Sequence, residues 1–130
     1  MRYDEFLAKV RDRGEYADQE EAAKVAEAVL EVLAGRITSA ETKDLAAQLP
    51  APLDAKLTAA ASEQPESYGV EEFCRRVAER TGARERTAQW DAGAVLTTLA
   101  ENVSPGELNQ LISQLPTGYA VLFGKPDLAD

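Results

Sequence analysis

The sequence contains no histidine and only one cysteine, Cys74. Histidine is the commonest general base at neutral pH and the commonest metal ligand, so its absence weakens every prediction of an enzyme or a metal centre. A single cysteine also excludes an internal disulfide. We therefore predict a protein that is not an enzyme and that holds no cofactor and no metal.

Long apolar runs are also missing. No stretch reaches the roughly 18 apolar residues that a membrane-spanning helix requires. The first ten residues, MRYDEFLAKV, carry charges where a signal peptide has its apolar segment. We therefore expect a cytoplasmic protein that does not contact a membrane. The 130 residues are 45% hydrophobic and 28% charged, a balance typical of one soluble domain, which we place at residues 1–130.

Positive charge is scarce overall, and the formal net charge is −9. Such a charge repels phosphate backbones at long range, which disfavours nucleic acid as a partner. The exception is one segment that gathers five of the 14 Lys and Arg residues, with Glu79 and Glu85 as its only acidic members. The arginines of this segment are Arg75, Arg76, Arg80, Arg84 and Arg86.

The chain contains an internal repeat. LAAQLP at residues 45–50 recurs as LISQLP at residues 111–116, which is 111 − 45 = 66 positions later. The segments 28–50 and 94–116 that end in these motifs are identical at ten of 23 positions. Further upstream, EFLAKVRDR at residues 5–13 matches EFCRRVAER at residues 72–80 with an offset of 67. Self-similarity at a nearly fixed offset indicates one structural unit that is used twice.

Apolar residues within each unit have helical spacing. The first helices are predicted from residues 3, 6, 7 and 10 and from residues 70, 73, 74 and 77, which follow the i, i+3, i+4, i+7 pattern. A longer second helix, a third and a short fourth follow in each unit. We predict an all-α fold of two tandem pseudo-symmetric repeats with about four helices each, packed as one compact bundle-like domain. The repeats span about 3–61 and 70–123, with a linker at 62–69 and a polar tail at 124–130.

The third helices have well-marked starts. Thr38 with Glu41, and Ser104 with Glu107, place a hydroxyl and a carboxylate three residues apart. This pattern is typical of a capping box, in which each side chain accepts a hydrogen bond from the other residue's backbone N–H. We therefore expect each glutamate to cap the start of its own helix.

The repeated Gln-Leu-Pro motif marks the end of each third helix. Leu49 and Leu115 are predicted core residues, while Pro50 and Pro116 disfavour helical backbone in the residue before them. Two interpretations of Gln48 and Gln114 are open. They bond the open backbone groups of this corner, or they form a pair of equivalent contact surfaces.

These features resemble a known family. Residues 6–10, residues 29–33 and LAAQLP, with EFCRRV, AVLTTL and LISQLP in the second copy, are similar to the small bacterial and archaeal proteins of domain of unknown function 2267. The resemblance covers nearly the whole chain. It implies an all-helical fold of two related halves and brings no activity, substrate or catalytic residue.

Three features are candidate sites. The arginine segment is either an anion site or a solvated face with ion pairs at i, i+4 spacing, which would be Glu71–Arg75, Glu72–Arg76 and Arg75–Glu79. Asp91 aligns with the apolar Val25, so it must be exposed or paired, and a neighbouring arginine is its expected partner. Trp90 beside it is either a core residue or an exposed contact. Cys74 aligns with Leu7 on an apolar stripe and is predicted to be a buried core residue.

The function that these patterns favour is a non-enzymatic helical module that binds a protein partner, whose identity the sequence does not give. The alternative is a regulatory or ligand-binding domain with an anion site near Arg75 to Arg86. An exposed apolar patch would indicate the first function, and a concave pocket containing arginines would indicate the second.

Overall fold

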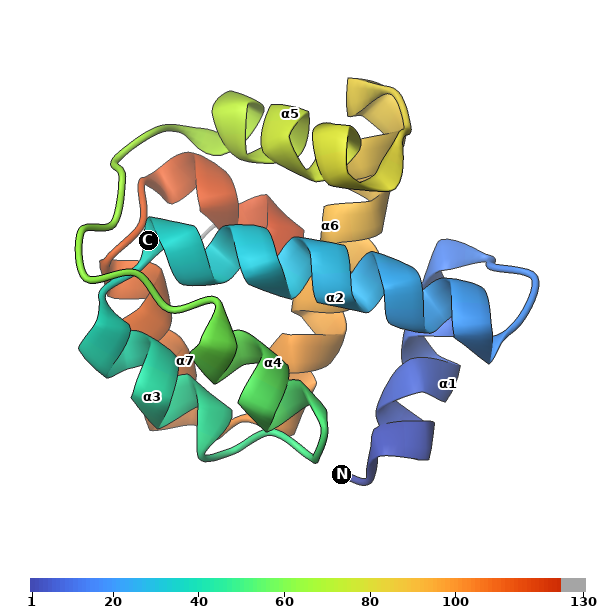
Figure 1. The fold of residues 1–130 in the computed structure, drawn as a ribbon, viewed down its shortest axis with the longest axis horizontal. Coiled ribbons are helices and arrows are strands. Elements are labelled where there is room, and N and C mark those ends of the chain that lie inside the picture. Colours follow the sequence, from blue (N-terminus) through green and yellow to red (C-terminus); the bar gives the residue numbers. More distant parts are fainter. Residues whose placement is uncertain (125–130) are drawn as a thin grey trace.

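The computed structural model describes residues 1–124, and in this range the chain forms helices and no strand (Figure 1). The first half contains α1 (Tyr3–Gly14), α2 (Gln19–Arg36), α3 (Ser39–Ala46) and α4 (Leu53–Ala59). The second half contains α5 (Val70–Thr81), α6 (Glu85–Asn102), α7 (Pro105–Ser113) and the 3-10 helix η1 (Thr117–Phe123). The predicted all-α fold is confirmed. The tail predicted at 124–130 lies outside the described residues except for Gly124.

The helix lengths follow the same series in both halves. The first helices have 12 residues each and the second helices 18 each. The third helices have 8 and 9 residues, and the fourth have 7 each. The series is consistent with two copies of one unit. The halves differ in the last element, which is an α-helix in the first half and a 3-10 helix in the second.

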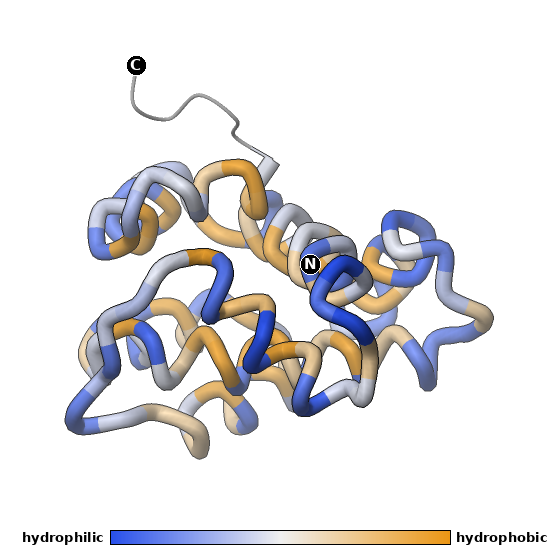
Figure 2. Tube along the Cα trace, turned by 90° about the horizontal axis from the view of Figure 1, so that it is seen from above, coloured by the Kyte–Doolittle hydropathy of each residue, from blue (hydrophilic) through white to orange (hydrophobic). Residues whose placement is uncertain are grey.

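The two long helices form the centre of the fold. α2 packs against α1, α4, α5 and α6, while α6 packs against α1, α2, α5 and η1. The first helix of each half therefore contacts the long helix of both halves. Hydrophobic positions recur along these helices at short intervals (Figure 2). One hydrophobic core results, and it contains fully buried residues from both halves, including Phe6, Leu33, Phe73 and Leu99.

The helix starts show which local predictions are correct. The Thr38 hydroxyl accepts a hydrogen bond from the Glu41 N–H at 3.1 Å, and the Ser104 hydroxyl accepts one from the Glu107 N–H at 3.2 Å. The hydroxyl half of each predicted capping box is thus confirmed.

No helix within residues 1–124 combines the length and the apolar character needed to cross a membrane.

Candidate functional site

The glutamines of the repeated motif reach across the molecule. The Gln48 side-chain oxygen accepts a hydrogen bond of 2.7 Å from the Ser104 N–H, and that of Gln114 accepts one of 3.4 Å from the Thr38 N–H. Thr38 and Ser104 are the N-caps of α3 and α7. Each glutamine therefore serves the third helix of the opposite half. The interpretation that it bonds its own corner is wrong, although its partner is an open backbone group.

The same exchange displaces the glutamates from the helix starts. Because glutamines occupy the N-cap N–H groups, Glu41 and Glu107 do not complete capping boxes, and this half of the prediction is wrong. Both are buried, with 2% and 8% of their surface exposed. Burial, a hydrogen bond with Glu107 and the negative charges of Glu107 and Asp44 raise the pKa of Glu41 well above its ordinary value.

Replacing Gln48 or Gln114 with Ala is expected to lower the free energy of unfolding by about 1 kcal/mol each, because a backbone N–H loses its acceptor. Urea denaturation measures the change. Gln110→Ala on α7 is the matched control, since this side chain is exposed. If the Gln48 and Gln114 variants unfolded at the wild-type midpoint, the cross-half hydrogen bonds would not contribute to stability.

Two arginines of the basic segment are held by a cluster of carboxylates. Arg75 pairs with Glu72 and Glu79, and Arg76 pairs with Glu66 and Glu72. Hydrogen bonds from Arg75, which contributes most, and from Arg76 lower the pKa of Glu72 to about 2. The predicted i, i+4 pairs Glu72–Arg76 and Arg75–Glu79 are confirmed, whereas the expected pairing of Arg75 with Glu71 is replaced by its pairing with Glu72.

The other arginines do not add to this cluster. Arg80 lies 3.7 Å from a carboxylate oxygen of Glu31 on α2. Arg84 and Arg86 are exposed at the start of α6, and neither forms an ion pair within residues 1–124. Arg76 also stacks on Tyr68, with its guanidinium 4.2 Å from the ring centroid. Most of the segment is therefore occupied by contacts within the protein.

Asp91 is buried, with 3% of its surface exposed, and its partner is Tyr16. The Tyr16 hydroxyl donates a hydrogen bond to Asp91 Oδ1, so the prediction of an arginine partner is wrong. Burial raises the pKa of Asp91, and the hydrogen bond from Tyr16 opposes this rise. Sequence reasoning missed Tyr16 because it lies in the α1–α2 loop, 75 residues away from Asp91.

Trp90 holds the same loop. Its indole N–H donates a 3.0 Å hydrogen bond to the Gly14 carbonyl, while the residue remains 52% exposed. A Cβ atom at Gly14 would lie 2.0 Å from the Tyr16 ring, so a residue without a side chain is required there. Trp90 and Asp91 thus fasten the α1–α2 turn to α6. This contact gives the buried Asp91 a partner at the position where the first half has the apolar Val25.

Cys74 is 7% exposed and belongs to the hydrophobic core. Burial raises the pKa of its thiol, which disfavours the thiolate that a nucleophile needs. Its placement agrees with the predicted core position.

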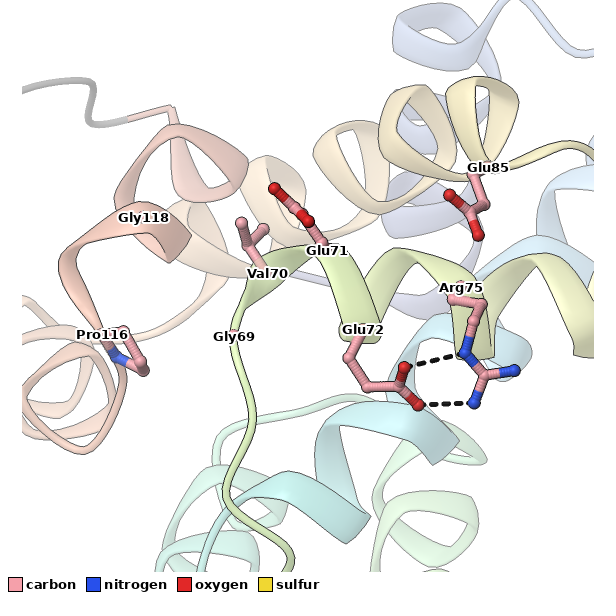
Figure 3. Close-up of a pocket in the computed structure, with 8 residues that line it drawn as sticks. All are labelled: Gly69, Val70, Glu71, Glu72, Arg75, Glu85, Pro116 and Gly118. Carbon is pink, nitrogen blue, oxygen red and sulfur yellow. Dashed lines mark hydrogen bonds and ion pairs between the residues drawn. The ribbon is translucent and has the colours of Figure 1, made fainter.

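An open groove lies between the start of α5 and η1. It has a volume of about 630 Å³ and is lined by Gly69, Val70, Glu71, Glu72, Arg75, Glu85, Pro116 and Gly118 (Figure 3). Figure 3 shows Val70 between Gly118 and Glu71, whereas Arg75 turns toward Glu72 and bonds it twice. A second hollow shares Val70, Glu71 and Glu85 and adds Val121, which is 53% exposed.

Sequence reasoning missed this groove because its walls come from three separate segments, which are the start of α5, the start of α6 and the region of Pro116, Gly118 and Val121 at η1. Of the candidate residues named from the sequence, the structure places Cys74, Arg75, Arg86 and Pro116 along the two hollows. A family model described as an uncharacterized conserved protein (DUF2267) matches residues 3–122, which contain nearly all of the eight helices. No curated protein matches the chain.

Proposed function

The chain belongs to the DUF2267 family of uncharacterized conserved proteins, whose description names no activity, and we propose a function from the geometry of the fold. We propose that the protein is a non-enzymatic helical module that binds a segment of a protein partner. The observation that carries the proposal is the groove between α5 and η1, with the adjoining hollow at Val121. Together they form a surface with an apolar base and an acidic rim, which we call the α5–η1 groove.

The lining residues indicate the chemistry of the partner. Val70, Pro116 and Val121 provide apolar contact, and Gly69 and Gly118 leave the backbone uncovered at the groove. An apolar side chain of a partner would gain free energy when it leaves water on this base, by about 25 cal/mol for each Å² buried. Val121 is one of three large hydrophobic residues that remain exposed within residues 1–124, and it extends this apolar surface.

The rim of the groove favours positive charge on the partner. Glu71 and Glu85 are exposed, and neither forms an ion pair within residues 1–124. Arg75 also lines the groove, but Glu72 and Glu79 offset its charge. The net charge of −9 attracts a basic segment at long range. We therefore expect a partner segment that places an apolar side chain between lysines or arginines.

The alternative of an anion site near Arg75 to Arg86 receives less support. Arg75, Arg76 and Arg80 already face carboxylates, and a ligand would have to replace those contacts. The groove beside Arg75 also carries Glu71 and Glu85, which repel an anion. A phosphate backbone meets the same repulsion.

The test compares two exposed positions on opposite parts of the fold. The immobilised protein is incubated with native cell extract at low salt, the captured protein is identified, and its basic segments are synthesised as peptides. We expect Val121→Glu to weaken binding of the matching peptide at least about tenfold, or about 1.4 kcal/mol. Thr58→Glu on α4, also exposed, should leave binding unchanged.

Reversing the rim charge gives a second measurement. Glu71→Lys should weaken the same peptide and reduce the dependence of its affinity on salt. Equal affinity of wild type, Val121→Glu and Glu71→Lys for every captured partner would contradict the proposed groove. An unchanged circular dichroism spectrum of each variant would show that a loss of binding does not result from unfolding.

A further inference from the structure

Two equivalent glutamates meet where the halves contact each other. Glu41 of α3 and Glu107 of α7 differ by 107 − 41 = 66 positions, which is the offset of the repeat. Both are more than nine-tenths buried, and the Glu107 carboxyl lies near enough to contribute to the raised pKa of Glu41. One oxygen of each, Oε2, is buried without a hydrogen-bond partner in the described structure.

This arrangement requires a proton. Ionised carboxylates only accept hydrogen bonds, so two of them cannot bond each other. Two buried like charges in contact are also strongly unfavourable. A single proton held between the two groups supplies the missing donor and leaves one negative charge in place of two. We propose that Glu41 and Glu107 form a proton-binding site at the contact of α3 with α7, and that this contact weakens when the shared proton is lost.

The surroundings add no positive charge that could replace the proton. Gln114 donates its side-chain N–H to Glu41 Oε1 at 3.2 Å, which satisfies one oxygen without changing the charge. α7 carries no titratable residue besides Glu107. The other charged residues of α3 are Lys43 and Asp44, both exposed, and Asp44 adds negative charge near Glu41.

α4, which also packs on α3, leaves the pair uncompensated too. Its Lys56 pairs with Glu27 of α2, and its Asp54 accepts a hydrogen bond from the Ala55 N–H. Arg36, at the end of α2, donates to the Tyr68 carbonyl and lies against the rings of Tyr68 and Tyr119. No ion pair with Glu41 or Glu107 forms among the residues described.

The direction of the pH effect follows from linkage. The folded protein holds the pKa of Glu41 above its ordinary value, so the folded state binds more protons than the unfolded chain in the interval between the two values. The stability from the shared proton is fully present below the ordinary glutamate pKa. It is lost as pH rises through the raised pKa of Glu41.

The direct test is a ¹³C NMR titration of the side-chain carboxyl groups in the full chain. The pair should titrate in two coupled steps, the second at least about one pH unit above the value of about 4.3 for an unperturbed glutamate. Glu41→Gln should abolish the upper step, because the amide donates to the remaining carboxylate. Glu107→Gln should do the same, and it keeps the test informative if one variant fails to fold.

Thermal unfolding supplies the second measurement. Between about pH 5 and pH 8 the melting temperature of the wild type should fall relative to that of Glu41→Gln. Glu63→Gln removes one exposed carboxylate and should follow the wild type. Titration of both buried glutamates near the ordinary value would overturn the proposal. So would a wild-type melting temperature that rises on adding Mg²⁺ or Ca²⁺ when that of Glu41→Gln does not, because the pair would then hold a cation.

Discussion

Replacing Leu115 or Leu49 with Ala is expected to lower the free energy of unfolding by about 2 to 5 kcal/mol. The two leucines occupy the same place in the repeated motif and are 8% and 7% exposed. Both belong to the core that the halves share. Truncation therefore removes buried apolar surface and leaves a cavity that the neighbouring helices fill only in part. Urea denaturation with an unchanged slope would report the loss directly.

Two control variants distinguish the loss of side-chain volume in the core from the effect of changing any residue of the repeated motif. Leu115→Met keeps most of the volume and should cost less than about 1.5 kcal/mol. Pro116→Ala should also cost less than Leu115→Ala, because the corner uses the Pro116 carbonyl, which accepts a 3.0 Å hydrogen bond from the Tyr119 N–H and is present in any residue. A loss below about 1 kcal/mol for both leucine variants would contradict their assignment to the core.

Replacing Tyr16 with Phe is expected to cost about 1 to 3 kcal/mol, because buried Asp91 loses its hydrogen-bond donor. The loss should be largest at a pH above the pKa of Asp91, where the carboxylate is ionised. It should shrink as pH falls, since the hydrogen bond from Tyr16 lowers the pKa of Asp91 and its removal favours the protonated form. Tyr3→Phe is the control, because the Tyr3 hydroxyl forms no side-chain hydrogen bond in the part of the chain that the structure describes.

The repeat suggests a rescue for this variant. The first half has Val25 where the second has Asp91. Adding Asp91→Val to Tyr16→Phe removes the unpaired carboxylate and should recover part of the loss, as often happens when a buried polar pair is replaced by apolar residues. If the double variant were less stable than Tyr16→Phe alone, the carboxylate would be stabilising the fold through another contact.

Local features of the fold could be predicted from the sequence. Apolar periodicity placed the first and second helices, and the hydroxyls of Thr38 and Ser104 marked the starts of the third. Helices arise from hydrogen bonds between residues four apart, so these signals lie within a few positions of each other. The burial of Leu49 and Leu115 follows from the same spacing.

Contacts between the halves were not predicted, because residues 49 to 92 positions apart meet only after packing. Gln48 and Gln114 were recognised as repeated, but their partners were assigned to the wrong half. Asp91 was recognised as unusual, but Tyr16 carried no signal. The contacts follow the repeat, because Gln48 bonds residue 104 and Gln114 bonds residue 38. The two partners are 104 − 38 = 66 positions apart, as expected when equivalent residues exchange partners.

The reciprocal capping means that each half depends on the other for its contacts. A lone half would leave the N–H of its third helix without an acceptor and its first helix without a second long helix to pack against. A separated half would therefore need a second copy of the unit to supply both contacts. Joining the two units through residues 60–69 makes their association intramolecular and frees folding from any dependence on protein concentration. It also allows equivalent positions of the two halves to differ, as Val25 and Asp91 do.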